Sequence, residues 1–206
     1  MSFEAWTIFA AFWVLFVTTP GPNAVNCINN GITLGFWRSL PAVAGILTQA
    51  SLFLTLSALG VTALIAGHPA VYDGAKLIGA AVLIYLGIRG WLNAAKPINL
   101  DAAPATSVYF RALAIATINP KSVAGYLAAF TQFVQPDVAI STQMWVIVPT
   151  ALTLTACSYL GYTALGAGIG RAALGAVFNA TLRRVMAACF IIYGLLLGST
   201  SAPRIT

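Results

Sequence analysis

The sequence predicts an all-α polytopic membrane protein with six transmembrane helices, arranged as two inverted three-helix repeats in which helices 1 and 4 are broken. Three observations lead to this prediction. Hydrophobic residues make up 60% of the chain and charged residues 7%, whereas about a quarter of an average soluble domain is charged. The apolar residues form continuous runs rather than the alternating pattern of a lipid-facing β-barrel. Two of these runs contain a proline-rich break at matching positions.

Six apolar stretches approach the ~20 residues that a helix needs to cross a bilayer. We expect spans at roughly residues 5–28, 40–66, 74–93, 110–134, 144–168 and 184–199. A polar linker, residues 96–107, divides the single transporter domain (residues 1–206) into repeat halves 1–95 and 108–206. Because each half holds an odd number of spans, the second copy inserts upside down, which makes the repeat inverted.

The two breaks read Thr19-Pro20-Gly21-Pro22-Asn23 and Thr117-Ile118-Asn119-Pro120-Lys121. Proline disrupts a helix interior but fits its first turn, where its missing N–H has no partner anyway. Pro22 and Pro120 are therefore expected to start new half-helices, with Asn119 as an N-cap. The start of a helix attracts a carboxylate through its free amides and its dipole. Either break alone is equally explained by a kink, but the matching pair favours a binding site near the bilayer midplane.

Lys121 falls inside the fourth expected span, where a lysine costs about 2.5–3.5 kcal/mol unless it finds a partner or water. The acidic residues lie at expected helix ends or loops, so no carboxylate is expected at its depth: they are Glu4, Asp73, Asp101 and Asp137. We expect Lys121 to face a water-filled cavity and to pair with the negative group of a substrate. Snorkelling to the membrane interface is the alternative.

Polar residues beside the breaks extend the candidate site. Asn23 and Asn26 share a helix face at i, i+3 spacing, and Gln49 interrupts the second span. The predicted substrate-binding set is Pro20, Gly21, Pro22, Asn23, Asn26, Gln49, Asn119, Pro120 and Lys121. The sequence shows no nucleophile–base pair, metal-ligand cluster or phosphate loop, and its three cysteines are widely spaced. We therefore expect no cofactor, no metal and no enzymatic activity.

The basic residues predict the orientation in the membrane. Seven of the ten follow the first, third and fifth spans: Arg38, Arg89, Lys96, Arg111, Arg171, Arg183 and Arg184. The positive-inside rule places these loops in the cytoplasm and both termini outside it. Their scatter along the chain argues against nucleic acid as a partner. The GxxxG pairs Gly166/Gly170 and Gly194/Gly198 predict close helix contacts, within one chain or across a homodimer.

Over essentially its whole length the chain resembles the LysE/RhtB family of bacterial amino-acid exporters. The motifs that carry the resemblance are Pro20-Gly21-Pro22-Asn23 and Asn119-Pro120-Lys121, together with Lys76, Gly79-Ala80 and Leu86-Gly87 in the third span. The resemblance implies proton-driven efflux of amino acids or related small metabolites across the bacterial inner membrane.

The residues themselves limit the substrate. With no carboxylate expected near the site, a cationic amino acid would lack a counter-charge, so a neutral or small polar amino acid such as homoserine or threonine is favoured. Two alternatives to a transporter are a passive channel and a non-transporting subunit of a membrane complex. A channel would present a continuous polar stripe, whereas the polar residues here cluster at the two breaks.

Overall fold

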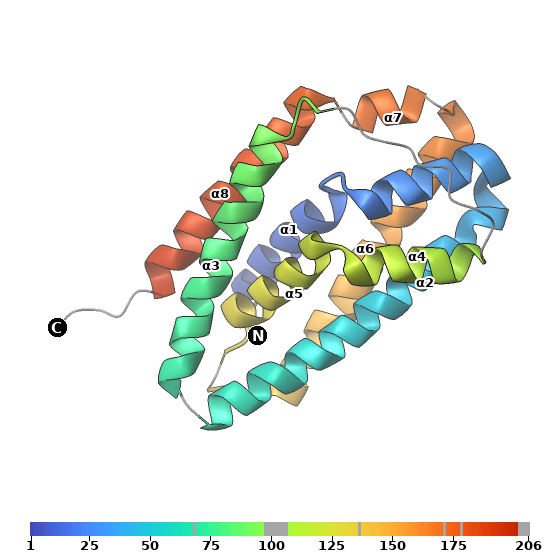
Figure 1. Ribbon diagram of the computed structural model, residues 1–206. Helices are drawn as coiled ribbons and strands as arrows, with labels where there is room; N and C mark the ends of the chain where they lie inside the picture. Colours follow the sequence, from blue (N-terminus) through green and yellow to red (C-terminus); the bar gives the residue numbers. More distant parts are fainter. Residues whose placement is uncertain (68, 97–106, 136, 171, 178, 202–206) are drawn as a thin grey trace.

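The computed structural model describes residues 1–67, 69–96, 107–135, 137–170, 172–177 and 179–201, and every regular element in these ranges is an α-helix. Figure 1 shows their arrangement. The helices are α1 (Phe3–Thr18), α2 (Pro22–Gly67), α3 (Pro69–Leu92), α4 (Val108–Ile118), α5 (Pro120–Phe133), α6 (Ile140–Ile169), α7 (Ala172–Val177) and α8 (Ala180–Ser201).

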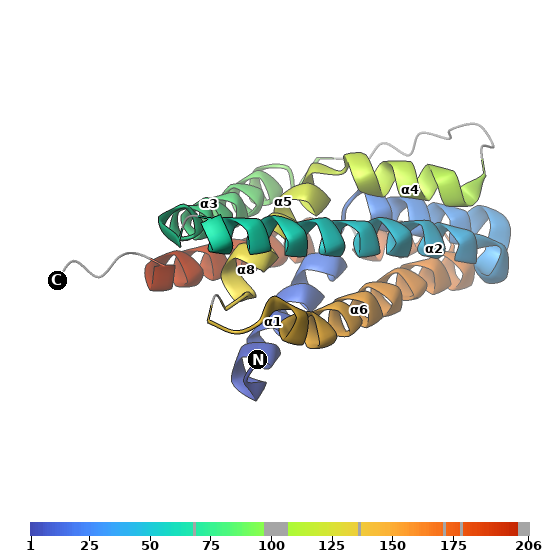
Figure 2. The ribbon, with the colours of Figure 1, turned by 90° about the horizontal axis from the view of Figure 1, so that it is seen from below.

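Two long helix pairs frame the molecule. α2 packs along α6 and α3 packs along α8, and these are the two most extensive helix contacts. The short helices α1 and α5 lie between the two pairs, as Figures 1 and 2 show. Their buried face is aromatic, and it forms the centre of the larger apolar core. The aromatic side chains there are Phe9, Phe12, Trp13, Phe16, Tyr126, Phe130 and Phe133.

Both expected breaks are confirmed. α1 ends at Thr18 and α2 begins at Pro22, while α4 ends at Ile118 and α5 begins at Pro120. Between α4 and α5 a single residue, Asn119, is extended (φ −68°, ψ 111°), and its side-chain oxygen accepts a hydrogen bond from the next helix. The prediction that Asn119 is an N-cap is therefore correct. Pro120 cannot continue α4 but is well suited to the first position of α5.

The turn expected between residues 28 and 40 is confirmed at Gly35, although the helical segments on both sides of it are longer than expected. Helical structure continues from Pro22 to Gly67 and is interrupted only at Gly35 (φ 75°, ψ 173°), where glycine adopts a conformation that other residues rarely reach. Asn29 and Asn30 are both helical, and Asn30 is buried. Other helices also begin earlier than expected, at residues 69, 108, 140 and 180, and the short α7 was not expected.

Helix lengths agree with a membrane setting. Among the described residues, Pro22–Gly60 in α2 and Ile140–Ile169 in α6 are long and apolar enough to cross a bilayer. α1 and α4 have 16 and 11 residues, or about 24 and 17 Å of helix, and are each too short to cross alone. Large apolar side chains cover the exterior, including Trp37, Leu59, Leu92, Trp145 and Leu196. Hydrocarbon would solvate such a surface, whereas water would not.

Glycines allow α3 and α8 to approach closely and reciprocally. A Cβ added to Gly87 would lie 2.7 Å from the carbonyl oxygen of Ala187, and one added to Gly194 would lie 2.9 Å from that of Ala80. The same shift along the sequence carries Ala80 to Ala187 and Gly87 to Gly194. Gly194 therefore makes the close contact predicted from its GxxxG motif, and does so within one chain.

Candidate functional site

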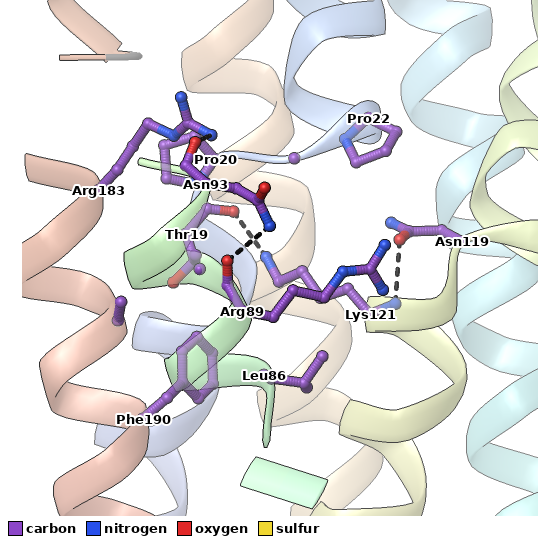
Figure 3. Close-up of a pocket in the computed structure, with 13 residues that line it drawn as sticks. Thr19, Pro20, Pro22, Leu86, Arg89, Asn93, Asn119, Lys121, Arg183 and Phe190 are labelled. Carbon is purple, nitrogen blue, oxygen red and sulfur yellow. Dashed lines mark hydrogen bonds between the residues drawn. The ribbon is translucent and has the colours of Figure 1, made fainter. Parts of the chain in front are cut away.

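The two breaks meet at Lys121. Its Nζ donates a 2.6 Å hydrogen bond to the carbonyl oxygen of Thr19, the residue after α1, and lies 5.2 Å from the centre of the Phe16 ring. Its backbone N–H donates to Oδ1 of Asn119 at 3.1 Å. Figure 3 shows both bonds. The ammonium of Lys121, on α5, thus lies at the C-terminal end of α1, which is the negative end of its dipole.

Side chains from α6 complete the end of α1. Ser158 donates its hydroxyl to the carbonyl oxygen of Val17 at 3.2 Å, and Tyr162 donates to that of Thr18. The last carbonyls of a helix have no partner within it. Because other helices supply these partners, the first break is a built feature of the fold and not a local kink.

A cavity of about 380 Å³ opens beside the breaks, within the usual size range of small-molecule sites. We call it the basic vestibule. It is lined by Thr19, Pro20, Gly21, Pro22, Leu86, Arg89, Gly90, Asn93, Asn119, Lys121, Arg183, Ala187 and Phe190. Three of these side chains are cationic, and none of the described lining residues is a carboxylate. The electrostatic field of the vestibule therefore favours an anionic group.

The arginines of the vestibule differ in their bonding. The guanidinium of Arg183 donates to the carbonyl oxygens of Asn93, Ala94 and Lys96 at 2.7, 2.7 and 3.0 Å. This clamp connects the start of α8 to the end of α3. The positive charge of Arg183 also lies at the C-terminus of α3, where the helix dipole favours a cation. Arg89 is exposed, and its side chain extends from α3 in the direction of α5 in Figure 3. Arg89 is therefore the better placed of the two to attract a substrate.

A second space lies on the other side of Asn119 and Lys121. It has about 10 Å³, enough for about one water molecule, and we call it the inner chamber. Its lining is Phe16, Val17, Asn23, Ile46, Gln49, Asn119, Lys121, Ser122, Tyr126, Thr155 and Tyr159. Asn119 and Lys121 line both spaces.

Residues 14–201 match the family described as LysE type translocator. The chain belongs to this family. It is 30% identical to an uncharacterised membrane protein of Vibrio cholerae, over 98% of this chain and 100% of the relative. It is also 28% identical to the homoserine/homoserine lactone efflux protein of Salmonella typhimurium (97% and 98% covered) and 26% identical to the leucine efflux protein of an Enterobacter species (76% of each). No solved structure matches.

In this LysE-type translocator, most of the predicted site residues gather around Lys121. Asn26 is buried on α2 but lines neither space. Pro120 begins α5, and its side chain lies outside the described part of the structure. The other seven line a cavity: Pro20, Gly21 and Pro22 the vestibule, Asn23 and Gln49 the inner chamber, and Asn119 and Lys121 both.

Several lining residues were not predicted from the sequence. Arg89 and Arg183 were used only to predict the orientation in the membrane. Arg89 lies near the end of α3 and Arg183 near the start of α8, and both line the vestibule. Thr155 and Tyr159 were also missed, although they stand one turn apart on a single face of α6. Polar residues at i, i+4 in an otherwise apolar span are the signal that could have found them.

Proposed function

We propose that this LysE-type translocator is a secondary transporter that exports a small amino acid across the bacterial inner membrane. The observation that carries the proposal is the meeting of the two breaks at Lys121 beside the basic vestibule. Here the ammonium of Lys121 and the starts of α2 and α5 favour a carboxylate, while the carbonyl end of α1 favours an ammonium. These are the two charges that every free amino acid carries.

The lining of the vestibule favours a neutral substrate. Its cations are Arg89, Lys121 and Arg183, and the carboxylates whose side chains the structure describes, Glu4 and Asp137, are exposed elsewhere. A lysine or arginine substrate would bring a further cation without a counter-charge. We therefore favour small neutral or polar amino acids such as homoserine or threonine. The named substrates of two relatives, homoserine and leucine, support a neutral amino acid.

We further propose six spans in two inverted repeats. α1 with the first part of α2 forms one broken span, and α4 with α5 forms the corresponding one. Each is followed by two long helices, and the reciprocal contacts of Gly87 and Gly194 support a two-fold relation between the halves. The proposed linker, residues 96–107, lies mostly outside the described residues. The positive-inside rule, applied to the basic loops, supports an orientation with both termini outside the cytoplasm.

This orientation directs the vestibule toward the cytoplasm, where an exporter takes up its substrate. In the proposed repeat, the contact of α3 with α5 corresponds to one of α8 with the start of α2. α3 packs extensively on α5, whereas α8 makes no comparable contact with α2 among the described residues. The vestibule lies between α8 and the start of α2. On the other side of Lys121 the aromatic core closes the path, where the Phe12 ring contacts those of both Phe16 and Phe133. A protein open to one side and closed to the other fits alternating access better than a passive channel.

Transport in vesicles tests the proposal. Purified protein should move labelled homoserine, and a proton gradient should drive accumulation that a protonophore abolishes. Lys121→Ala and Asn23→Ala should insert normally but lose transport, while Thr55→Val, on the exposed face of α2, should transport normally. Full transport by the first two variants would remove the site assignment. Flux that does not saturate with homoserine concentration would favour a channel.

A further inference from the structure

Two buried amides of the inner chamber are incompletely bonded. Asn23 and Gln49 are 4% and 1% exposed. Asn23 donates a long bond of 3.5 Å from Nδ2 to the hydroxyl of Tyr159, while its Oδ1 and the Nε2 of Gln49 find no partner among the described residues. A buried polar atom without a partner costs about 1–3 kcal/mol. Of the two unpaired atoms, Oδ1 of Asn23 is an acceptor and Nε2 of Gln49 is a donor.

At one other buried position the protein itself satisfies a glutamine side chain. Gln143 is as deeply buried as Gln49, yet its Nε2 donates to the carbonyl oxygens of Gln135 and Val138 at 2.9 Å. Its Oε1 accepts from the backbone N–H of Gln135, also at 2.9 Å. Gln143 is thus fully bonded by the protein itself, whereas the unpaired atoms in the chamber are open to a bound water molecule or to a polar group of a ligand. Asn26 and Asn30 also carry unpaired atoms, but they lie outside the chamber.

The size of the chamber limits what can satisfy these atoms. About 10 Å³ admits one water-sized group. Thr155 is already engaged, because its hydroxyl accepts from Nε1 of Trp13 and donates to the carbonyl of Ala151. A hydroxyl group has the size of the space and can donate to Asn23 while accepting from Gln49. A methyl group would fill the space and leave both atoms unpaired.

We propose that the inner chamber is the side-chain subsite of this transporter and that it selects amino acids with a short hydroxyl-bearing side chain. Asn23 and Gln49 are its specificity-determining residues. The inference rests on the proposed function, in which the substrate carboxylate pairs with Lys121. Because Lys121 and Asn119 line both the vestibule and the chamber, a substrate that pairs with Lys121 has its side chain beside the chamber.

Homoserine and norvaline provide a matched pair of substrates, since they differ by a hydroxyl in place of a methyl at the end of a side chain of equal length. Wild-type protein in vesicles should export homoserine at least about tenfold more efficiently than norvaline, because norvaline leaves two buried polar atoms unpaired. Gln49→Met keeps the approximate shape and removes the donor. Its homoserine-to-norvaline ratio should fall toward one. Thr55→Val removes an exposed hydroxyl from the same helix and should keep the wild-type ratio.

The outcomes separate this inference from the proposed function. Equal export of both amino acids by the wild type, or an unchanged ratio in Gln49→Met, would overturn the subsite and leave the exporter intact. Export of neither homoserine, norvaline nor leucine would count against the exporter itself. Should Gln49→Met fail to fold, thermal stabilisation of the wild type by each amino acid decides the question. Homoserine should stabilise the protein more, and equal stabilisation would overturn the inference.

Discussion

The ammonium of Lys121 bonds to the carbonyl oxygen of Thr19 at 2.6 Å and so joins the two breaks, which are 102 residues apart in sequence. The bond compensates the lysine charge with the negative end of α1, since no carboxylate lies among the described residues that line either space. In the proposed function, a substrate carboxylate that pairs with Lys121 would compete with this bond, and a substrate ammonium would replace the lysine at Thr19. The contact is therefore positioned to separate resting and loaded states.

The first prediction concerns ligand binding at Lys121. Replacing it with methionine keeps an unbranched side chain over Phe16 but removes the charge. Homoserine should raise the thermal midpoint of the purified wild type, because a ligand of the folded state stabilises it, and should leave that of Lys121→Met unchanged. Equal shifts in the two proteins would show that the substrate carboxylate does not need this lysine.

The second prediction concerns the Arg183 clamp. Arg183→Met removes three charge-assisted hydrogen bonds to carbonyls at the end of α3, and we expect the protein to lose about 2 kcal/mol of stability. Arg183→Lys should recover only part of this, since one ammonium cannot match the fork of a guanidinium. Arg184→Met is the matched control. Arg184 is exposed, and its guanidinium carbon lies 6.0 Å from the centre of the Trp91 ring, which is a weak contact compared with three hydrogen bonds. Thermal midpoints in detergent measure all three, and equal losses at 183 and 184 would contradict the clamp.

The sequence sufficed for the features that rest on local chemistry. Prolines and a capping asparagine act within one helical turn, so both breaks and the start of α5 at Pro120 were predictable. The turn near Gly35 was also expected, but the helix before it extends through Asn29 and Asn30, beyond the end expected at residue 28. Burial of Asn30 depends on packing between helices that are distant in sequence.

The candidate site was predicted only in part for the same reason. The chemistry of Lys121 indicated a buried cation that needs a partner, but nothing local identifies a backbone carbonyl 102 residues away as that partner. Arg89 and Arg183 come together only because α3 and α8 pack side by side. Likewise, the unpaired atoms of Asn23 and Gln49 become visible only when every neighbouring hydrogen bond is known.

The third prediction tests the α3–α8 contact. In Gly87→Ala the new methyl carbon would lie 2.6 Å from Cγ1 of Ile191 and 2.7 Å from the carbonyl oxygen of Ala187, so we expect a loss of about 1–3 kcal/mol. Gly161→Ala in α6 is the control, because nothing lies within 4 Å of its added Cβ and alanine favours a helix by up to about 1 kcal/mol. Gly161→Ala should be neutral or stabilising in thermal unfolding. A Gly87→Ala protein as stable as wild type would argue against the close helix contact.

The fourth prediction concerns substrate capture by Arg89, the exposed cation of the vestibule. Arg89→Gln should raise the KM for homoserine export by about 3–10-fold, because the field that draws the carboxylate into the vestibule weakens. The maximal rate should change less, since Lys121 still binds the substrate. The KM of the wild type should also rise with ionic strength, and that dependence should flatten in the variant. Arg38→Gln removes an exposed charge that does not line the vestibule and should keep the wild-type KM. Equal effects of the two substitutions would indicate that net charge, and not the position of Arg89, controls capture.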